Sequence, residues 1–185
     1  MSYYDPYPSM YLAKPKVLIG PLGGGIGVTG AMVSALTGLP FMDLDRLVEH
    51  AFGLDFRDVV TQHGWEAWRE CEYTTLSRVL DQRPAGIIIL GEGALDQDRT
   101  RRLVLERSDG WYLARNVFDT FGRLKTVWDT HYLRFPNFLE MPTLQDLQKL
   151  QSQRTAGYHT LPNAEDVSGI HPNEVARWLV DRWDV

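Results

Sequence analysis

Residues 20–30 read GPLGGGIGVTG and join two different kinds of segment. Before them, Lys16–Ile19 (KVLI) is a short apolar run that is typical of a buried strand. After them, residues 29–36 have the pattern of a helix. A strand that passes through a glycine-rich turn into a helix is the repeating unit of α/β proteins, so this stretch predicts that fold class.

The rest of the chain continues the alternation of strands and helices. Further strands are predicted at residues 41–43, 86–90 and 110–113, and the apolar run GIIIL at 86–90 is typical of a strand buried on both faces of a parallel sheet. Helices are predicted at residues 46–52, 56–63, 65–80, 99–106, 117–125, 143–153 and 173–183. We therefore expect a three-layer α/β/α fold with a parallel sheet and with ligands at the carboxyl ends of the strands.

The domain organisation is expected to be simple, with a single domain over residues 1–185. Residues 1–15 are rich in tyrosine and proline and predict an irregular N-terminal arm. Residues 126–142, approximately, are aromatic and interrupted by proline, which indicates a mobile, lid-like segment.

Composition and charge exclude several classes of function. The net charge of −5 and the scattered Lys and Arg argue against nucleic-acid binding. The single cysteine, Cys71, permits no internal disulfide and no cysteine zinc site, which fits the cytoplasm. No secretory signal and no bilayer-length apolar segment is evident, so we expect no membrane association. His63, His131 and His159 are too dispersed along the chain to suggest a metal site.

The landmarks, taken in order, resemble shikimate kinase, a P-loop kinase of the nucleoside monophosphate kinase type, over about residues 16–183. Residues 20–30 correspond to the family's G-P-x-G-A/S-G-K-S/T-S/T-x-G loop. The family's F-x-D-x-D is present as FMDLD at residues 41–45, and its G-E-x-x-F-R-x-x-E resembles GWEAWRECE at 64–72. The resemblance implies a shikimate-kinase-like fold with a lid, and binding of shikimate or a similar cyclohexene polyol acid.

The resemblance implies specific roles on the acid side of the site. Asp45 would accept the proton of the attacking hydroxyl, and Arg69 and Arg154 would hold the substrate carboxylate through their guanidinium forks. Glu72 follows Arg69 on the same helix face and can steady it. The other residues implied for substrate binding are Gly93, Arg134 and Tyr158. Two alternatives stay open from the residues alone: Asp45 as a helix N-cap, and Arg69–Glu72 as a surface helix pair.

The nucleotide side departs from the pattern of a phosphate-binding loop, G-x-x-x-x-G-K-S/T. Ile26 and Gly27 occupy the Lys and Ser/Thr places, and Thr29 is expected to face the sheet. Since each lost electrostatic group costs on the order of 3 kcal/mol, we expect ATP and Mg²⁺ to bind weakly or not at all, and no cofactor. The remaining candidates are Gly23, Gly24 and Gly25 as a backbone anion site or a plain turn, Arg123 as the adenine-side arginine, and Asp43 as a relic of a metal ligand.

Glu92 stands within the family's glycine triplet, which falls on Glu92-Gly93-Ala94 or one place earlier on Gly91-Glu92-Gly93. A carboxylate there would face the substrate or plug the site. Beside Asp45 it would form a carboxylate pair with separated pKa values, as general acid and base require. The alternative is that Glu92 points to solvent or pairs with a nearby arginine.

From these losses we expect a repurposed enzyme, an ATP-independent carbon–oxygen lyase (dehydratase) in which Asp45 and Glu92 remove water from a shikimate-like acid. Kinase activity is not expected. One alternative is a non-catalytic sensor or regulatory pseudokinase that binds the acid. Another is a weak shikimate kinase that uses Lys125 or Arg134. The sequence names no protein partner.

Overall fold

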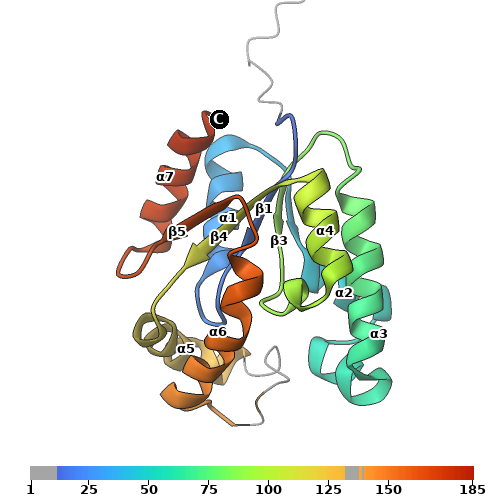
Figure 1. Cartoon of the computed structure of the whole chain (residues 1–185), viewed down its shortest axis with the longest axis vertical. Helices are drawn as coiled ribbons and strands as arrows, with labels where there is room; N and C mark the ends of the chain where they lie inside the picture. Colours follow the sequence, from blue (N-terminus) through green and yellow to red (C-terminus); the bar gives the residue numbers. More distant parts are fainter. Residues whose placement is uncertain (1–11, 132–137, 139) are drawn as a thin grey trace, which may run out of the picture.

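The computed structural model describes residues 12–131, 138 and 140–185, and within them five strands form one sheet (Figure 1). The strand order is β2-β3-β1-β4-β5, and every neighbouring pair is parallel. The strands are β1 Lys16–Ile19, β2 Phe41–Asp43, β3 Ile87–Ile89, β4 Asp109–Ala114 and β5 Asn163–Asp166. The predicted α/β fold with a parallel sheet is confirmed.

Helices connect the strands and cover both faces of the sheet. They are α1 Ile26–Thr37, α2 Leu44–Phe52, α3 Phe56–Val79, the 3-10 helix η1 Ala94–Asp96, α4 Asp98–Arg107, α5 Val117–His131, α6 Leu144–Tyr158 and α7 Pro172–Trp183. In Figure 1, α1 and α7 lie on one side of the sheet and α3 and α4 lie on the other. None of the helices in the described part of the chain is long and apolar enough to cross a membrane.

The central strands are apolar on both faces because both faces are covered. Successive residues of a strand point to opposite sides. Val17 and Ile88 lie in a core with side chains of α3, α4 and α6, whereas Leu18 and Ile87 lie in a second core with side chains of α1 and α7. This double burial explains why β1 and β3 are read correctly from short apolar runs.

The structure differs from the sequence-based expectation at several elements, and α5 and α6 extend to His131 and Tyr158 rather than ending at residues 125 and 153. β5 (NAED) is not predicted, because it is a polar strand at the edge of the described sheet, where it pairs with β4 and its residues are mostly exposed. α1 begins at Ile26 rather than at residue 29. The two helices predicted at 56–63 and 65–80 are the two parts of α3, whose helical conformation is interrupted at Gly64 (φ 83°), the position of the predicted break. The arm before residue 12 and residues 132–137 and 139 of the predicted lid, Arg134 among them, lie outside the described residues, whereas residues 126–131 of that segment belong to α5.

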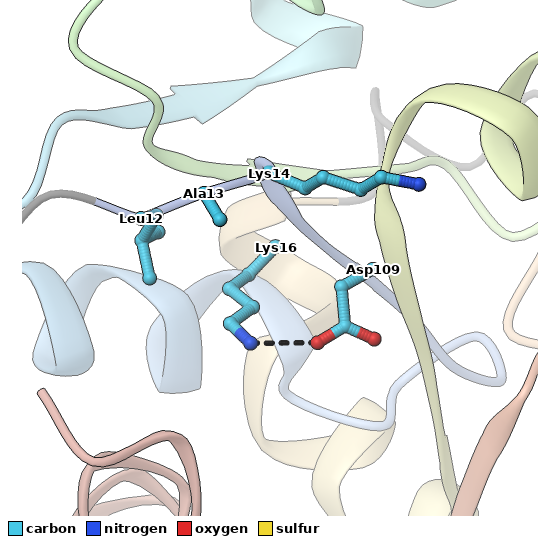
Figure 2. Close-up of a pocket in the computed structure, with 5 residues that line it drawn as sticks. All are labelled: Leu12, Ala13, Lys14, Lys16 and Asp109. Carbon is cyan, nitrogen blue, oxygen red and sulfur yellow. Dashed lines mark hydrogen bonds and ion pairs between the residues drawn. The ribbon is translucent and has the colours of Figure 1, made fainter.

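An ion pair closes the amino end of the sheet. Figure 2 shows the Lys16 ammonium directed at Asp109, with 2.6 Å between Nζ and Oδ2, at the first residues of β1 and β4. Asn163 donates to the other carboxylate oxygen of Asp109 (2.8 Å), and the Lys16 ammonium lies 5.3 Å from the centre of the Trp183 ring. The small cavity beside Leu12 therefore lies at the opposite end of the strands from the candidate functional residues.

Candidate active site

The candidate residues follow three neighbouring strands of the sheet. The glycine-rich loop follows β1, residues 43–45 end β2 and begin α2, and residues 91–93 follow β3. Because β2, β3 and β1 are adjacent and parallel, their carboxyl ends lie along one edge of the sheet. This is the edge at which open α/β sheets bind ligands.

Asp45 lies directly against the segment that follows β3. A Cβ atom built on Gly91 would be 2.5 Å from Oδ1 and 3.0 Å from Oδ2 of Asp45, so only glycine leaves room for the carboxylate. The N-cap of α2 is Asp43, whose Oδ1 accepts a hydrogen bond from the Arg46 backbone N–H (3.3 Å). The alternative that Asp45 is the N-cap is therefore wrong, and its carboxylate lies at the site.

The surroundings of Asp45 favour its protonated form. Burial raises the pKa of its carboxyl well above the usual range, and the nearby carboxylates of Glu72, Glu92 and Asp43 raise it further. The positive charge of Arg69 lowers the pKa but does not cancel these effects. Such a shift is typical of catalytic carboxylates that act as bases near neutral pH.

The raised pKa of Asp45 predicts a stability change. The folded protein binds this proton more tightly than the unfolded chain, so the contribution to stability is present below the ordinary pKa of aspartate and is lost as pH rises through the folded-state pKa. We expect Asp45→Asn to raise Tm at neutral pH by about 2–4 °C, the shift that 1 kcal/mol produces in a chain of this size. Thermal melts at several pH values check it, and a gain that fails to shrink towards pH 3 would contradict the account.

Two arginines from distant helices meet at Gly93. A Cβ atom on Gly93 would collide with Nη2 of Arg69, from α3, and would lie 2.9 Å from Nη2 of Arg154, from α6. Both guanidinium groups therefore lie against Gly93, two residues after Gly91, which lies against Asp45. The structure thus brings together Asp45, Arg69 and Arg154, the three side chains that the sequence assigns to the acid substrate.

Arg69 is held by a buried carboxylate. Its Nη1 lies 2.7 Å from Oε2 of Glu72, whose side chain is 0% exposed, and its guanidinium lies 5.3 Å from the centre of the Trp65 ring. Burial raises the pKa of Glu72, and the charge of Arg69 opposes that shift. The alternative of a surface helix pair is therefore wrong, because the pair is a buried support for the site.

Glu92 pairs with Arg154. Its Oε1 lies 3.1 Å from Nη1 of Arg154, and Asp96 Oδ2 lies 3.3 Å from Nε of the same guanidinium. Of the arrangements left open for Glu92, the structure therefore has the one in which it pairs with an arginine. The charge of Glu92 still reaches Asp45 and raises its pKa. Glu92 is thus a partner of the arginine that is assigned to the substrate carboxylate.

Tyr158 lies beneath the 91–93 segment. Its hydroxyl donates to the Glu92 backbone carbonyl (2.7 Å), its side chain is 2% exposed, and its ring centre lies 4.8 Å from that of Tyr112. Burial, more than the charge of Glu92, raises the pKa of the Tyr158 hydroxyl. With its hydroxyl committed to the backbone, Tyr158 positions the segment, which differs from the direct substrate contact expected from sequence.

The glycine-rich loop presents backbone groups at the N-terminus of α1. Gly25 is the N-cap in a left-handed conformation (φ 76°), and as a glycine it has no side chain that could cap the helix. The first N–H groups of a helix have no partner within the helix and attract anions. The Ile26 side chain is buried in the core, and the Thr29 hydroxyl, 1% exposed as a residue, donates to the Gly25 carbonyl (3.2 Å). Thr29 faces inward, as predicted.

Helix α5 lies across this loop. A Cβ atom on Gly23 would be 2.7 Å from the Thr120 carbonyl oxygen, and one on Gly25 would be 2.8 Å from Cζ of Arg123. Arg115, at the end of β4, is a buried cation that the sequence analysis missed; its Nη2 donates to the Ile170 carbonyl (3.0 Å). Its place two residues after the predicted strand at 110–113 is the signal that the sequence offers.

Similar proteins were found by sequence and by structure. Residues 23–183 match the family model described as shikimate kinase. The chain is 29% identical over 124 residues to the shikimate kinase of Rhodopseudomonas palustris, which covers 67% of this chain and 61% of that protein. It is 33% identical over 105 residues to the shikimate kinase of Caulobacter vibrioides, covering 57% of this chain and 52% of that protein. The chain thus spans about half to three fifths of the length of these curated relatives.

The fold is similar to solved structures of the same kind. The structure of shikimate kinase from Acinetobacter baumannii in complex with shikimate superposes with a TM-score of 0.81. The two sequences are 20% identical, and the alignment covers 92% of this chain and 93% of the other. This likeness supports the three-layer architecture.

These matches overturn the expectations of an ATP-independent lyase or regulatory pseudokinase and of a protein without ATP or Mg²⁺. Shikimate kinases are phosphotransferases that use both. The error came from weighing two loop positions, whereas phosphoryl-transfer sites collect charge from several elements. Because the family model matches most of its residues, the chain belongs to the shikimate kinase family.

Proposed function

We propose that this chain transfers a phosphoryl group from ATP to a hydroxyl of shikimate or a closely related cyclic hydroxy acid. The observation that carries the proposal is the convergence of Asp45, Arg69 and Arg154 on the two glycines that follow β3. The A. baumannii relative was solved in complex with shikimate, which supports this class of substrate.

The two arginines suit a carboxylate at one end of a rigid ring. A guanidinium fork binds a carboxylate through two parallel hydrogen bonds, and each such bond is stronger than a neutral one. Glu72 fixes the direction of the Arg69 fork, and Asp96 contacts the Nε edge of Arg154. With its carboxylate held by both forks, the ring acid would extend from Gly93 towards Asp45.

Asp45 suits the role of general base. In the transfer, the substrate hydroxyl oxygen bonds to the γ-phosphorus, the bond from that phosphorus to the β–γ bridging oxygen breaks, and ADP leaves. The hydroxyl proton passes to the Asp45 carboxylate. A carboxylate with a raised pKa is a stronger base than an ordinary one, provided that it is ionised at the working pH.

The nucleotide would bind at the loop edge. The uncapped N-terminus of α1 offers backbone N–H groups for phosphate oxygens. Mg²⁺ bound with a nucleotide needs one or two protein carboxylates besides the phosphates, and Asp43, at the end of β2, fits that need. We infer the cytoplasm as the compartment, because Cys71 is the single cysteine of the sequence and no internal disulfide can form.

A substrate comparison tests the proposed function. Release of ADP is measured with Mg²⁺-ATP and either shikimate or its methyl ester, which keeps the hydroxyls but lacks the negative charge. We expect turnover with shikimate and a KM for the ester higher by about 10-fold or more, because charge-assisted bonds to both forks are lost. Equal turnover of acid and ester would contradict the assignment of Arg69 and Arg154.

Glu92 gives a separate prediction about affinity. Its carboxylate occupies Nη1 of Arg154, which the substrate carboxylate also needs, so the two compete. We expect Glu92→Ala to tighten shikimate binding by about 3- to 10-fold in calorimetric titration, since one competing charge is removed. Asp96→Ala is the matched control, because Asp96 contacts the other edge of the guanidinium and is more exposed (48%). Weaker binding by Glu92→Ala would mean that Glu92 orients Arg154 for the substrate.

A further inference from the structure

The loop lacks a cation of its own. Ile26 stands at the place of the loop lysine, and its side chain turns into the core, where Cδ1 would lie 2.5 Å from a Cβ on Gly20. The Thr29 hydroxyl is directed at the Gly25 carbonyl. Backbone N–H groups are therefore the polar groups that residues 25–29 themselves offer to a phosphate.

A guanidinium from another element lies on the loop. A Cβ atom on Gly25 would collide with Nη2 of Arg123 and would lie 2.8 Å from Cζ and 3.1 Å from Nε. Contact with all three atoms means that the planar group covers Gly25, the N-cap of α1. One helical turn earlier on α5, the Thr120 carbonyl contacts Gly23 in the same way. The two left-handed glycines thus let α5 approach closely enough to bring Arg123 to the N-terminus of α1.

The charge of Arg123 has no counterion among residues 12–131, 138 and 140–185. Its guanidinium makes no hydrogen bond or ion pair there, and its Nε is buried without an acceptor. A buried donor without an acceptor is unfavourable unless a ligand supplies one. A second cation, Arg115, is near Arg123. The pKa of Arg115 is lowered first by burial and second by the positive charge of Arg123. Asp119 and Asp166 face Arg115 and offset part of the repulsion.

We propose that Arg123 takes over the work of the missing loop lysine, and that its guanidinium binds the phosphate chain of the nucleotide at the N-terminus of α1. The inference rests on the proposed function for the presence of a nucleotide. It differs from the role that resemblance implies for this arginine, which is on the adenine side. The planar guanidinium of Arg123 would donate two directed hydrogen bonds to the phosphate oxygens, whereas the ammonium of a lysine is a compact charge without a fixed fork of donors.

The test separates phosphate from adenine recognition. ADP, inorganic tripolyphosphate and adenosine are titrated calorimetrically into the full chain and into Arg123→Gln, which keeps the length and removes the charge. We expect ADP and tripolyphosphate to bind about 10- to 100-fold more weakly to the variant, and adenosine to bind within about 2-fold of the original protein. Lys149→Gln, which removes the charge of an exposed lysine on α6, is the control and should bind all three ligands normally.

Three outcomes would overturn the inference. These are unchanged tripolyphosphate binding in Arg123→Gln, an equal loss for adenosine and ADP, and a wild-type protein that binds neither ADP nor tripolyphosphate. If Arg123→Gln does not fold, as judged by circular dichroism, Arg123→Lys replaces it and should keep most of the tripolyphosphate affinity. Failure of the proposed function is distinguishable, because it would leave the acid unphosphorylated while nucleotide binding still depended on Arg123.

Discussion

Replacing Asp45 by asparagine is expected to lower kcat for phosphoryl transfer by about 10²- to 10⁴-fold, while shikimate binds within about 3-fold of its original affinity. The asparagine amide fits the space against Gly91 but accepts no proton from the substrate hydroxyl. Single-turnover rates and calorimetric titration measure the two quantities separately. A loss of affinity that matches the loss of rate would mean that Asp45 binds the substrate and does not act as a base.

The pH dependence provides a second readout for the same residue. Asp45 must be ionised to accept a proton, and its pKa is raised chiefly by burial. The rate of wild-type turnover should therefore rise with pH at values above the usual range of an aspartate, and this limb should be missing in Asp45→Asn. Asp58→Asn is the control, since Asp58 is an exposed aspartate in the first turn of α3 and is not among the charges that shift the pKa of Asp45. It should keep the limb that belongs to Asp45.

The second large effect is expected at Arg69. Arg69→Met should lower the free energy of unfolding by about 3–5 kcal/mol, because it leaves the fully buried Glu72 carboxylate without its cation. It should also weaken shikimate binding by about 10- to 100-fold, the range for a lost charge-assisted hydrogen bond. Chemical denaturation and calorimetry check the two values.

A double variant separates stability from binding at this pair. Arg69→Met with Glu72→Gln removes both charges, so most of the lost stability should return while shikimate binding stays weak. Arg154→Met is the comparison, because its partners are a 14% exposed Glu92 and a 48% exposed Asp96, and it should lose binding with a smaller loss of stability. Recovery of binding in the double variant would show that Arg69 does not contact the substrate.

The sequence predicts the central strands of the sheet well, because their short apolar runs are explained by burial on both faces. A buried parallel strand must be apolar on both faces, so residues 16–19 and 86–90 are identified without structural information. β5 fails this criterion, because Asn163–Asp166 is a polar edge strand that is specified by its pairing with β4. The break at Gly64 is identified because a left-handed residue in a helical pattern favours glycine.

The site is predictable where its residues carry a motif and not where it depends on packing between distant elements. Asp45, Arg69 and Arg154 could be assigned by resemblance. The partner of Glu92 could not, because Arg154 comes from α6, 62 residues along the chain. The contact of Arg123 with Gly25 depends on how closely α5 crosses the loop, which no local pattern records. The prediction of a lyase weighed the missing loop lysine alone, and the match to the shikimate kinase family overturns it.

The proposed reaction is ATP-dependent phosphorylation of a shikimate-like acid by a chain without a lysine at position 26. It is tested by mass spectrometry of shikimate after incubation with the protein, Mg²⁺ and ATP labelled with heavy oxygen in its γ-phosphoryl group. We expect a product heavier by one labelled phosphoryl group, formed in step with ADP and absent with Asp45→Asn. Shikimate recovered unchanged, or without the label, after prolonged incubation with protein that binds both ligands would contradict it.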